Sequence, residues 1–177
     1  MSCLKDLGQN IVLCKKCDLG SMGTNPVLGE GPADSKIMIV GEAPGANEEK
    51  VGRPFVGRGG KLLRKTLEKF EIKNPYITNV VKHRPPENRK PKKEEIIACS
   101  DFLECEINAV KPHVILALGK TAAEYFGIKS RLSEVNGKIF EIKGIKVVAC
   151  YHPAAVLRNT NLTDEFNQAI GQAKMAL

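Results

Sequence analysis

The sequence predicts an α/β fold, namely a three-layer α/β/α sandwich with a central, mainly parallel, four-stranded sheet. First, short β-branched runs alternate along the chain with longer segments in which apolar residues recur at helical spacing. Such alternation favours parallel strands with helices on both faces. Second, two unusual motifs, at 41–45 and 152–158, each follow directly on a strand-like run. Loops at the carboxyl ends of parallel strands meet at one edge, so both motifs are expected to face one pocket.

In the first half of the chain we expect a helix, a strand, a helix and a strand. Apolar residues at helical spacing predict a short amphipathic helix at 4–11, and a β-branched run predicts the first strand at 36–41. Leucines and a phenylalanine at the helical period predict a helix at 58–70. The second strand is expected at 76–81.

In the second half, Pro91 suits the first position of a helix whose apolar stripe extends to Val110. Gly127 is expected to end a helix that follows the third strand. The remaining expected elements are that third strand at 113–118, a hairpin or edge strand at 139–142, a fourth main strand at 147–151 and a terminal helix at 162–176.

Length and composition limit the class of protein. The 177 residues, 42% of them hydrophobic, suffice for one core, so we expect a single domain over 1–177 that includes the amino-terminal Cys-x-x-Cys segment. No stretch approaches the roughly 20 apolar residues of a membrane span. The first residues do not follow the pattern of a signal peptide. The protein is therefore expected in the cytoplasm, as a monomer without a membrane partner.

The formal net charge of +7 suggests a polyanionic partner, and its distribution strengthens that interpretation. Between positions 82 and 93 a single acid, Glu87, stands among six basic residues, which are Lys82, Arg84, Arg89, Lys90, Lys92 and Lys93. Crowded like charges repel one another unless an anion neutralises them, so this stretch predicts contacts with phosphates. The alternative is a solvated approach to a helix.

Cys14 and Cys17 form a Cys-x-x-Cys pair that precedes the whole predicted sheet. A redox pair of the thioredoxin type lies near a βαβ unit, so a metal site suits this position better. Cys99 is the best third ligand and His83, at the exit of the second strand, the best fourth. The reserves are Cys3, Cys105 and Cys150. Thiolates suit zinc or an iron–sulfur cluster, and the spacing does not separate the two; a surface pair without metal is the alternative.

Three side chains near the predicted loops suit a flat polar ligand. Phe55 lies among glycines in a polar loop, where it is less easily buried, so it can serve as a stacking platform instead of a core residue. Asn79 can present an amide donor and acceptor from the end of the second strand. His152 opens the last motif.

Several runs, in this order and spacing, carry a family resemblance. They are Cys14-x-x-Cys17, Gly41-Glu42-Ala43-Pro44-Gly45-Ala46-Asn47-Glu48-Glu49, Gly52-Arg53-Pro54-Phe55-Val56-Gly57, Thr78-Asn79-Val80-Val81-Lys82, Arg84-Pro85-Pro86-Glu87-Asn88-Arg89, Cys99, Leu118-Gly119-Lys120-Thr121-Ala122 and His152-Pro153-Ala154-Ala155-Val156-Leu157-Arg158. Together they resemble the uracil-DNA glycosylase superfamily, most closely its family 4, the iron–sulfur branch. The resemblance covers nearly the whole chain.

The resemblance implies a monofunctional DNA-repair enzyme that hydrolyses the bond between uracil and deoxyribose and leaves an abasic site. The base must first leave the stack. Phe55 would then stack on the uracil ring, and Asn79 would pair with its polar edge. His152 would donate to the base oxygen as negative charge develops there, together with backbone N–H groups of the first loop. The loop residues expected to bind the base are Gly41, Ala43 and Gly45.

The resemblance also implies how DNA is held, whether single- or double-stranded. Lys82, Arg84 and Arg89 would contact phosphates. Leu157 and Arg158 would form the wedge that holds the emptied base stack open.

Two positions depart from superfamily members whose first motif reads Gly-Gln-Asp-Pro-Tyr-His. Ala43 stands where those members place an aspartate that guides water, so Glu48 is our candidate for that task, with Glu42 behind it. Gly45 stands where they use a tyrosine to exclude the methyl group of thymine. Glu48 is our candidate to fill that space as well.

An iron–sulfur cluster of the [4Fe-4S] type is the cofactor that the resemblance implies. His83 stands where family 4 members generally carry the third cluster cysteine. Three interpretations follow: a cluster held by Cys14, Cys17, His83 and Cys99, a cluster that recruits Cys105, or a lost cluster. We favour the first, because imidazole is an accepted cluster ligand.

Two other functions stay open. One is a non-catalytic lesion- or DNA-binding protein of the same fold, which would not need all of Phe55, Asn79, His152 and Glu48. The other is a zinc-stabilised nucleic-acid module that uses the cysteines alone. Visible colour separates an iron–sulfur protein from this second alternative.

Overall fold

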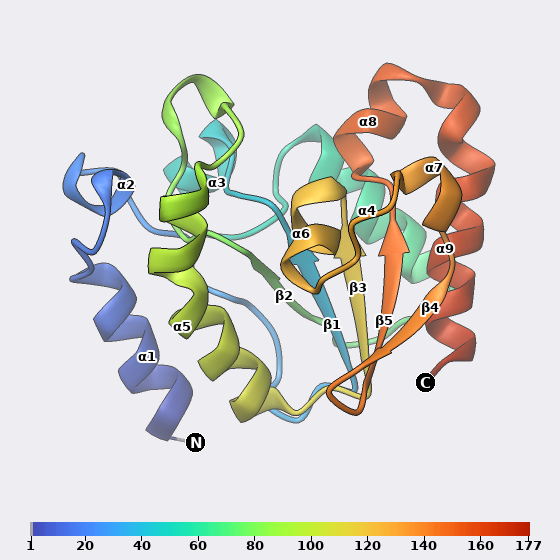
Figure 1. Cartoon of the computed structure of the whole chain (residues 1–177), viewed down its shortest axis with the longest axis horizontal. Coiled ribbons are helices and arrows are strands. Elements are labelled where there is room, and N and C mark those ends of the chain that lie inside the picture. Colours follow the sequence, from blue (N-terminus) through green and yellow to red (C-terminus); the bar gives the residue numbers. More distant parts are fainter. Residues whose placement is uncertain (1) are drawn as a thin grey trace.

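A five-stranded sheet forms the centre of the computed structural model, which describes residues 2–177 (Figure 1). Its order is β2-β1-β3-β5-β4. The strands are β1 (Ile37–Gly41), β2 (Tyr76–Asn79), β3 (Val114–Leu118), β4 (Ile139–Ile142) and β5 (Ile145–Cys150). The four strands other than β4 run parallel, and β4 pairs antiparallel with β5. The prediction of four main parallel strands is thus confirmed.

The expected four-stranded sheet is nevertheless one strand too small. Residues 139–142, expected as a hairpin or edge strand, join the same sheet as β4. The connection to β5 is the two-residue turn Lys143-Gly144, and both residues have positive φ, 51° and 78°. Such a turn matches the twist of paired strands, so β4 forms a hairpin with β5 and is the edge strand of the sheet, as expected for this segment.

Helices cover both faces of the sheet. They are α1 (Ser2–Val12), α2 (Asp18–Ser21), α3 (Ala46–Val51), α4 (Arg58–Lys69), α5 (Lys93–Val110), α6 (Lys120–Tyr125), α7 (Leu132–Val135), α8 (Pro153–Arg158) and α9 (Thr163–Met175), with short 3₁₀ turns at Pro86–Asn88 and Thr160–Leu162. Pro91 precedes α5 by two residues instead of opening it, and β2 ends two residues earlier than expected. None of the helices within 2–177 is long and apolar enough to cross a membrane.

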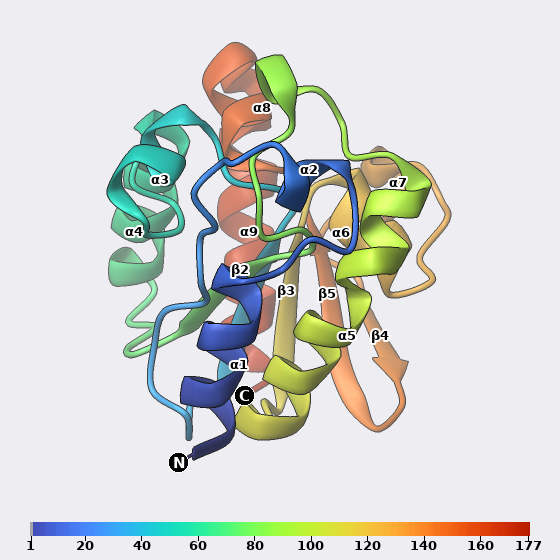
Figure 2. The same ribbon diagram turned by 90° about the vertical axis from the view of Figure 1, so that its left-hand side faces the viewer.

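The two faces of the sheet build two hydrophobic cores. Alternate residues of β1 point to opposite sides: Met38 and Val40 pack with α1 and α5, whereas Ile37 and Ile39 pack with α4 and α9. Figure 2 looks onto α1 and α5, with the sheet behind them and α9 beyond it. All residues of β1, β2 and β3 are buried. This burial on both faces confirms the three-layer sandwich.

Strand register brings the carboxyl ends of the parallel strands together. Gly41 at the end of β1 pairs with Asn79 at the end of β2, and Leu118 of β3 pairs with Cys150 of β5. The segments that follow these ends lead into α3, α6, α8 and the loop before α5, which lie at one edge of the sheet in Figure 1. Ligands of open α/β sheets bind at this edge.

Candidate functional site

A cleft of about 630 Å³ opens at the carboxyl edge of the sheet. Of the residues proposed from the sequence, Glu42, Ala43, Gly45, Glu48, Phe55, Asn79, Arg89, His152 and Arg158 line it. They come from three stretches that are far apart in the chain, at 42–55, 79–89 and 152–158. The two motif loops therefore do face a common pocket, as their positions after β1 and β5 predicted.

Phe55 is only 6% exposed and packs with the core on the α4 side of the sheet, so the expectation that its loop keeps it out of the core was wrong, although it still lines the cleft. Gly41 allows Phe55 and Asn79 to meet. A methyl group added to Gly41 would come within 2.5 Å of Phe55 Cζ and closer still to Asn79 Oδ1. The absence of a side chain at the end of β1 is thus what permits the ring and the amide to pack together. Gly60, in the first turn of α4, likewise lies against the backbone of Phe55, where any Cβ would overlap it.

Asn79 carries a polar atom that is ready for a ligand. Its side chain is only 3% exposed, and its Oδ1 has no hydrogen-bond partner among residues 2–177. A buried polar atom of this kind costs free energy unless something pairs with it. Because Asn79 lines the cleft, a ligand with a complementary polar edge would supply the missing hydrogen bond.

His152 is held as a neutral hydrogen-bond donor. It caps α8, and its Nδ1 accepts a hydrogen bond from Ala154 N at 3.2 Å, which leaves the ring proton on Nε2. Burial, reinforced by the charge of Arg158 and opposed by that of Glu48, lowers the pKa of His152 to about 4. The ring centroid lies 5.9 Å from that of Phe55. An imidazole with this pKa is uncharged at neutral pH and can donate through Nε2.

Glu48 ties the first loop to the loop that carries Phe55. Its Oε1 accepts hydrogen bonds from Val56 N at 2.8 Å and Gly57 N at 2.7 Å, and its Oε2 accepts one from Gly45 N at 3.2 Å. A Cβ on Gly45 would lie 2.8 Å from Glu48 Oε2. The carboxylate therefore occupies the space in which a side chain at position 45 would begin.

Glu42 is turned toward α6. Its Oε2 accepts a short hydrogen bond from the hydroxyl of Thr121, a buried residue in the first turn of that helix. Glu42 still lines the cleft, beside Ala43. Thr121 belongs to one of the runs that carry the family resemblance, but no role was predicted for it, because its position next to Glu42 follows from the packing of α6 over β1.

Lys82 was wrongly predicted to contact phosphate. Its side chain is fully buried, and its ammonium pairs with Glu106 at 2.7 Å. It also donates to Thr78 Oγ1 at 2.7 Å and to the carbonyl of Asn79 at 2.8 Å. The charge run around Lys82 could not reveal this, because its partner lies 24 residues further on, in the buried face of α5.

Arg84 and Arg89 are reachable from solvent, but each is already paired with a carboxylate. Arg84 donates to Glu49 at 3.1 Å, and Arg89 holds Glu95 through two hydrogen bonds of 2.6 and 2.8 Å. Arg89 lines the cleft. The predicted run of uncompensated charge is thus partly neutralised within the protein.

Other cations flank the cleft more openly. Arg158 lines it from the end of α8, and the neighbouring Leu157 is 39% exposed. Arg58 and Lys120, both exposed and both in the lining, were missed by the sequence analysis. Each is the first residue of a helix that begins at the carboxyl edge of the sheet. A basic residue at such a position could have been predicted to lie beside the cleft.

A second, smaller pocket gathers the four proposed metal ligands. Cys14, Cys17, His83 and Cys99 all line it. His83 Nδ1 lies 3.1 Å from both the carbonyl and the hydroxyl of Thr24, while its buried Nε2 has no partner among the described residues. The orphaned Nε2 and three sulfurs around one pocket are donor types that an iron–sulfur cluster accepts.

Two other cysteines whose side chains the structure describes do not share this pocket. Within residues 2–177, Cys105 is exposed on α5 and Cys150 is buried in β5, and neither contributes to the lining. The side chain of Cys3 lies outside the described residues. Burial raises the pKa of the Cys99 thiol to about 11, so metal binding there would have to displace a proton. No three such donors in this range converge on a point suited to a single ion.

Comparison with known proteins gives a consistent set of relatives. The Uracil DNA glycosylase superfamily matches residues 28–173. A type-4 uracil-DNA glycosylase of Archaeoglobus fulgidus is 43% identical, over 94% of this chain and 89% of its own length. Proteins of the same description are 44% identical in Sulfurisphaera tokodaii, over 92% of this chain and 79% of theirs, and in Pyrobaculum aerophilum, over 93% and 90%.

Proposed function

This chain belongs to the uracil DNA glycosylase superfamily, and we propose that it is a type-4 enzyme that hydrolyses the N-glycosidic bond of uracil in DNA. The observation that carries the proposal is the meeting of Phe55, Asn79 and His152 in one cleft at the carboxyl edge of the sheet. An aromatic face, an unpaired amide and a neutral imidazole are the groups that a flipped uracil requires.

The first step is capture of the base. Extrusion from the stack costs a few kcal/mol, least where the base is mispaired or single-stranded. Phe55 then offers its ring for stacking, and the Asn79 amide pairs with the polar edge of uracil. Cytosine presents the opposite pattern of donor and acceptor at that edge. It would leave buried polar groups unmatched and is therefore rejected.

The second step is departure of the base as an anion. Negative charge develops on the base oxygens as the bond to the sugar breaks. His152, neutral and with its proton on Nε2, donates a hydrogen bond toward that charge and does not first have to be protonated. Backbone N–H groups of the loop at 41–45 act beside it.

Water must then reach the cationic sugar. Glu48 is our candidate to guide it, because its carboxylate lies at the cleft and is fixed by three backbone N–H donors. Glu42, held by Thr121, stands behind it. A fixed carboxylate also stabilises the positive charge of the sugar electrostatically. The carboxylate beside Gly45 leaves less room for the methyl group of thymine.

DNA would be gripped by the cations around the cleft. Arg58, Arg89, Lys120 and Arg158 line its walls and are placed to contact phosphates, with Arg84 nearby. Leu157, exposed at the end of α8, would fill the gap that the extruded base leaves. The substrate is thus DNA that contains uracil, and the enzyme would act as a cytoplasmic monomer.

Cys14, Cys17, His83 and Cys99 would hold an iron–sulfur cluster of the [4Fe-4S] type. Such a cluster binds through thiolates, accepts imidazole in place of thiolate, and can exchange single electrons. In this protein its contribution would be structural, because the four residues that would hold it join the segment before α2 to the loop after β2 and to α5.

Incubation with a uracil-containing oligonucleotide, followed by alkali to reveal abasic sites, tests the activity. His152→Ala and Asn79→Ala should each lower the single-turnover rate by about 10²–10⁴. His113→Ala and Asn108→Ala, which remove the same groups from exposed positions, should leave it unchanged. An active Asn79→Ala variant with the same base selectivity would contradict the assignment. A wild-type protein that binds but never cleaves would be a DNA-binding protein of this fold.

Iron content tests the metal centre. His83→Ala should lose iron and the broad visible absorbance, because it removes one of the donors in the pocket, whereas Cys105→Ala should keep both. His83→Cys, which restores a thiolate, should retain the cluster. The reverse result for the two alanine variants would assign the fourth ligand to Cys105. A colourless protein that contains zinc would instead favour a zinc-stabilised module.

A further inference from the structure

Phe55 adopts a backbone conformation that its side chain does not favour. Its φ is +53°, in the left-handed region. A bulky residue rarely adopts this conformation, which costs free energy and persists only when the surrounding structure imposes it. The question is therefore which groups keep Phe55 in place, since its ring must face the cleft in order to stack on a base.

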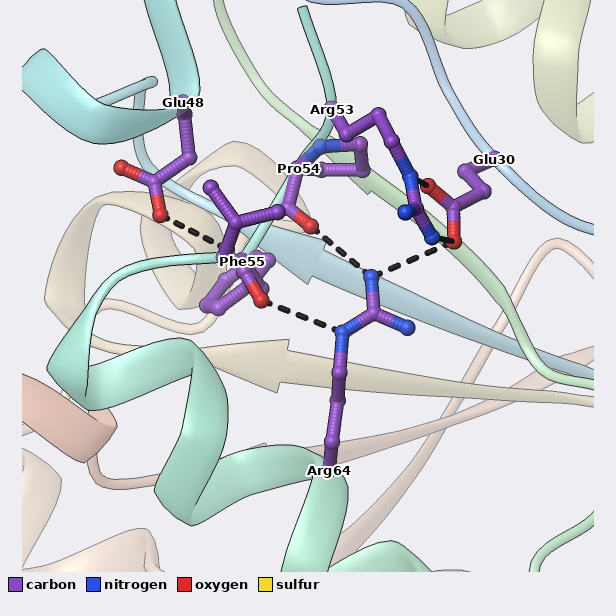
Figure 3. Close-up of polar contacts among 7 residues, drawn as sticks. Glu30, Glu48, Arg53, Pro54, Phe55 and Arg64 are labelled. Carbon is purple, nitrogen blue, oxygen red and sulfur yellow. Dashed lines mark hydrogen bonds and ion pairs between the residues drawn. The ribbon is translucent and has the colours of Figure 1, made fainter. Parts of the chain in front are cut away.

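Arg64 of α4 holds the two consecutive carbonyls at this point of the loop (Figure 3). Its Nε donates to the carbonyl of Phe55 at 3.1 Å, and its Nη2 donates to the carbonyl of Pro54 at 2.9 Å. A planar guanidinium can hold both oxygens at once, and neither a lysine nor an uncharged side chain of similar length can replace this fork.

Glu30 orients that guanidinium. Its Oε1 lies 3.3 Å from Arg64 Nη2, and the same carboxylate accepts two hydrogen bonds from Arg53, of 2.7 and 2.9 Å (Figure 3). Glu30 is itself anchored, because its backbone exchanges two hydrogen bonds with Ile77 of β2, of 2.9 and 2.7 Å. A chain of polar contacts thus runs from the sheet to the carbonyl of Phe55.

The opposite side of the loop is held by Glu48, which accepts from Val56 N and Gly57 N. The carbonyls of Pro54 and Phe55 are therefore held by the cationic Arg64, and the next two backbone amides are held by the anionic Glu48. Of these two charged residues, Glu48 lines the cleft and Arg64 does not. Arg64 lies behind the loop and lines a separate hollow with Leu67 and Ile72.

We propose that Arg64, oriented by Glu30, is a positioning residue that sets the Phe55 ring for stacking and so increases affinity for the extruded base. The inference rests on the proposed role of Phe55 as the stacking residue. Without the clamp the loop can relax from the left-handed conformation, and the population that presents the ring to the cleft falls. Arg64 would thus act on base recognition without touching the base.

Two oligonucleotides separate this role from a structural one. One carries 2′-fluoro-2′-deoxyuridine, which resists cleavage and presents the base, and the other carries a tetrahydrofuran abasic analogue. Arg64→Met should raise the Kd for the first about tenfold, the order expected from release of one strained conformation. The Kd for the second should stay within about twofold, since no base is stacked. Uniform weakening of both would overturn the inference, as would no change in either.

Arg53→Met is the matched control, because it removes the same charge and a Glu30 partner but no contact with a carbonyl of Pro54 or Phe55. It should change the Kd for the fluorouridine oligonucleotide by less than about threefold, which is less than about half of the effect of Arg64→Met on the free-energy scale. If Arg64→Met does not fold, Arg64→Lys can be tested with the same two oligonucleotides. It keeps the charge but not the fork, so it should raise the Kd for the fluorouridine oligonucleotide by less than about tenfold and leave the Kd for the abasic analogue unchanged.

The Phe55→Ala variant distinguishes the inference from the assignment on which it rests. If Phe55→Ala leaves the Kd for the fluorouridine oligonucleotide unchanged, the proposed role of Phe55 fails. If it weakens binding, the double variant Phe55→Ala/Arg64→Met should be no weaker than Phe55→Ala alone, because Arg64 acts through that ring. Additive losses would show that Arg64 acts by another route and would overturn the inference.

Discussion

The cleft and the cysteine-lined pocket are built in different ways. The cleft takes Asn79 from the end of a fully buried strand and His152 from the first residues after another, so the sheet holds both directly. The pocket takes Cys14 and Cys17 from the irregular segment between α1 and α2. The contacts that join this segment to α5 include the exposed ion pair of Lys16 with Asp101. Exposed ion pairs of this kind contribute little to the free energy of folding.

The cysteine-lined pocket is therefore expected to depend more on its ligand than the cleft does. Paired strands hold the backbone of Asn79, and its Oδ1 is already buried and unpaired in the protein without a ligand. The pocket takes two of its four donors from a segment outside regular secondary structure, so a bound cluster would contribute to the free energy that keeps that segment in place. The geometry of the cleft is thus supplied by the fold, whereas the proposed metal centre would depend on both the fold and the bound cluster.

Lys82 connects the two regions, and its removal should have the largest effect on stability. It lines the pocket, while its ammonium holds the carbonyl of Asn79 and pairs with Glu106. Lys82→Met leaves a buried carboxylate unpaired and should lower the free energy of unfolding in urea by about 3–5 kcal/mol. Lys93→Met, an exposed change in the same basic stretch, should alter it by less than about 0.5 kcal/mol.

A double variant sharpens that test. Lys82→Met/Glu106→Leu removes both charges, so it should recover much of the stability that Lys82→Met loses. Uracil excision by the double variant would report how far the cleft depends on this ion pair. A loss below about 1 kcal/mol for Lys82→Met, the value typical of an exposed pair, would contradict the burial described here.

Protonation of His152, in the cleft, should lower the free energy of unfolding by less than Lys82→Met does. Because the pKa of His152 is lowered to about 4, the unfolded chain takes up its proton near the ordinary value of about 6.5 while the folded protein does not. The contribution of His152 is therefore fully present above pH 6.5 and is lost as the pH falls toward 4. With allowance for partial exposure, the loss is about 2 kcal/mol.

Urea unfolding at pH 7 and pH 4.5 measures this term. The wild type should lose more stability between these values than His152→Gln, which cannot take up the proton. The exposed His113→Gln should behave as the wild type does. Equal pH dependence in the wild type and in His152→Gln would mean that His152 is solvated and that the cleft is not preorganised around a neutral donor.

Particular residues show how far prediction from the sequence reached. Asn79 and His152 were placed correctly at the edge of the sheet, because each follows a strand-like run and parallel strands end together. Cys99 and His83 were correctly placed beside the cysteine pair. Lys82 was misassigned, since neighbours in sequence do not reveal whether a lysine at a strand exit points inward. Arg58, Lys120 and Arg64 were missed for the same reason.

Local patterns in the sequence were sufficient to predict the layers of the sandwich, most of its elements and the edge of the sheet where the cleft lies. These follow from local periodicity and from the handedness and direction of strand connections, which act over short stretches of chain. Only the tertiary structure decided which charges meet. It buried Lys82 against Glu106, turned Arg64 onto the carbonyl of Phe55 and left Asn79 Oδ1 unpaired. Such contacts join residues that are distant in the chain, and their energies depend on burial, which no local pattern encodes.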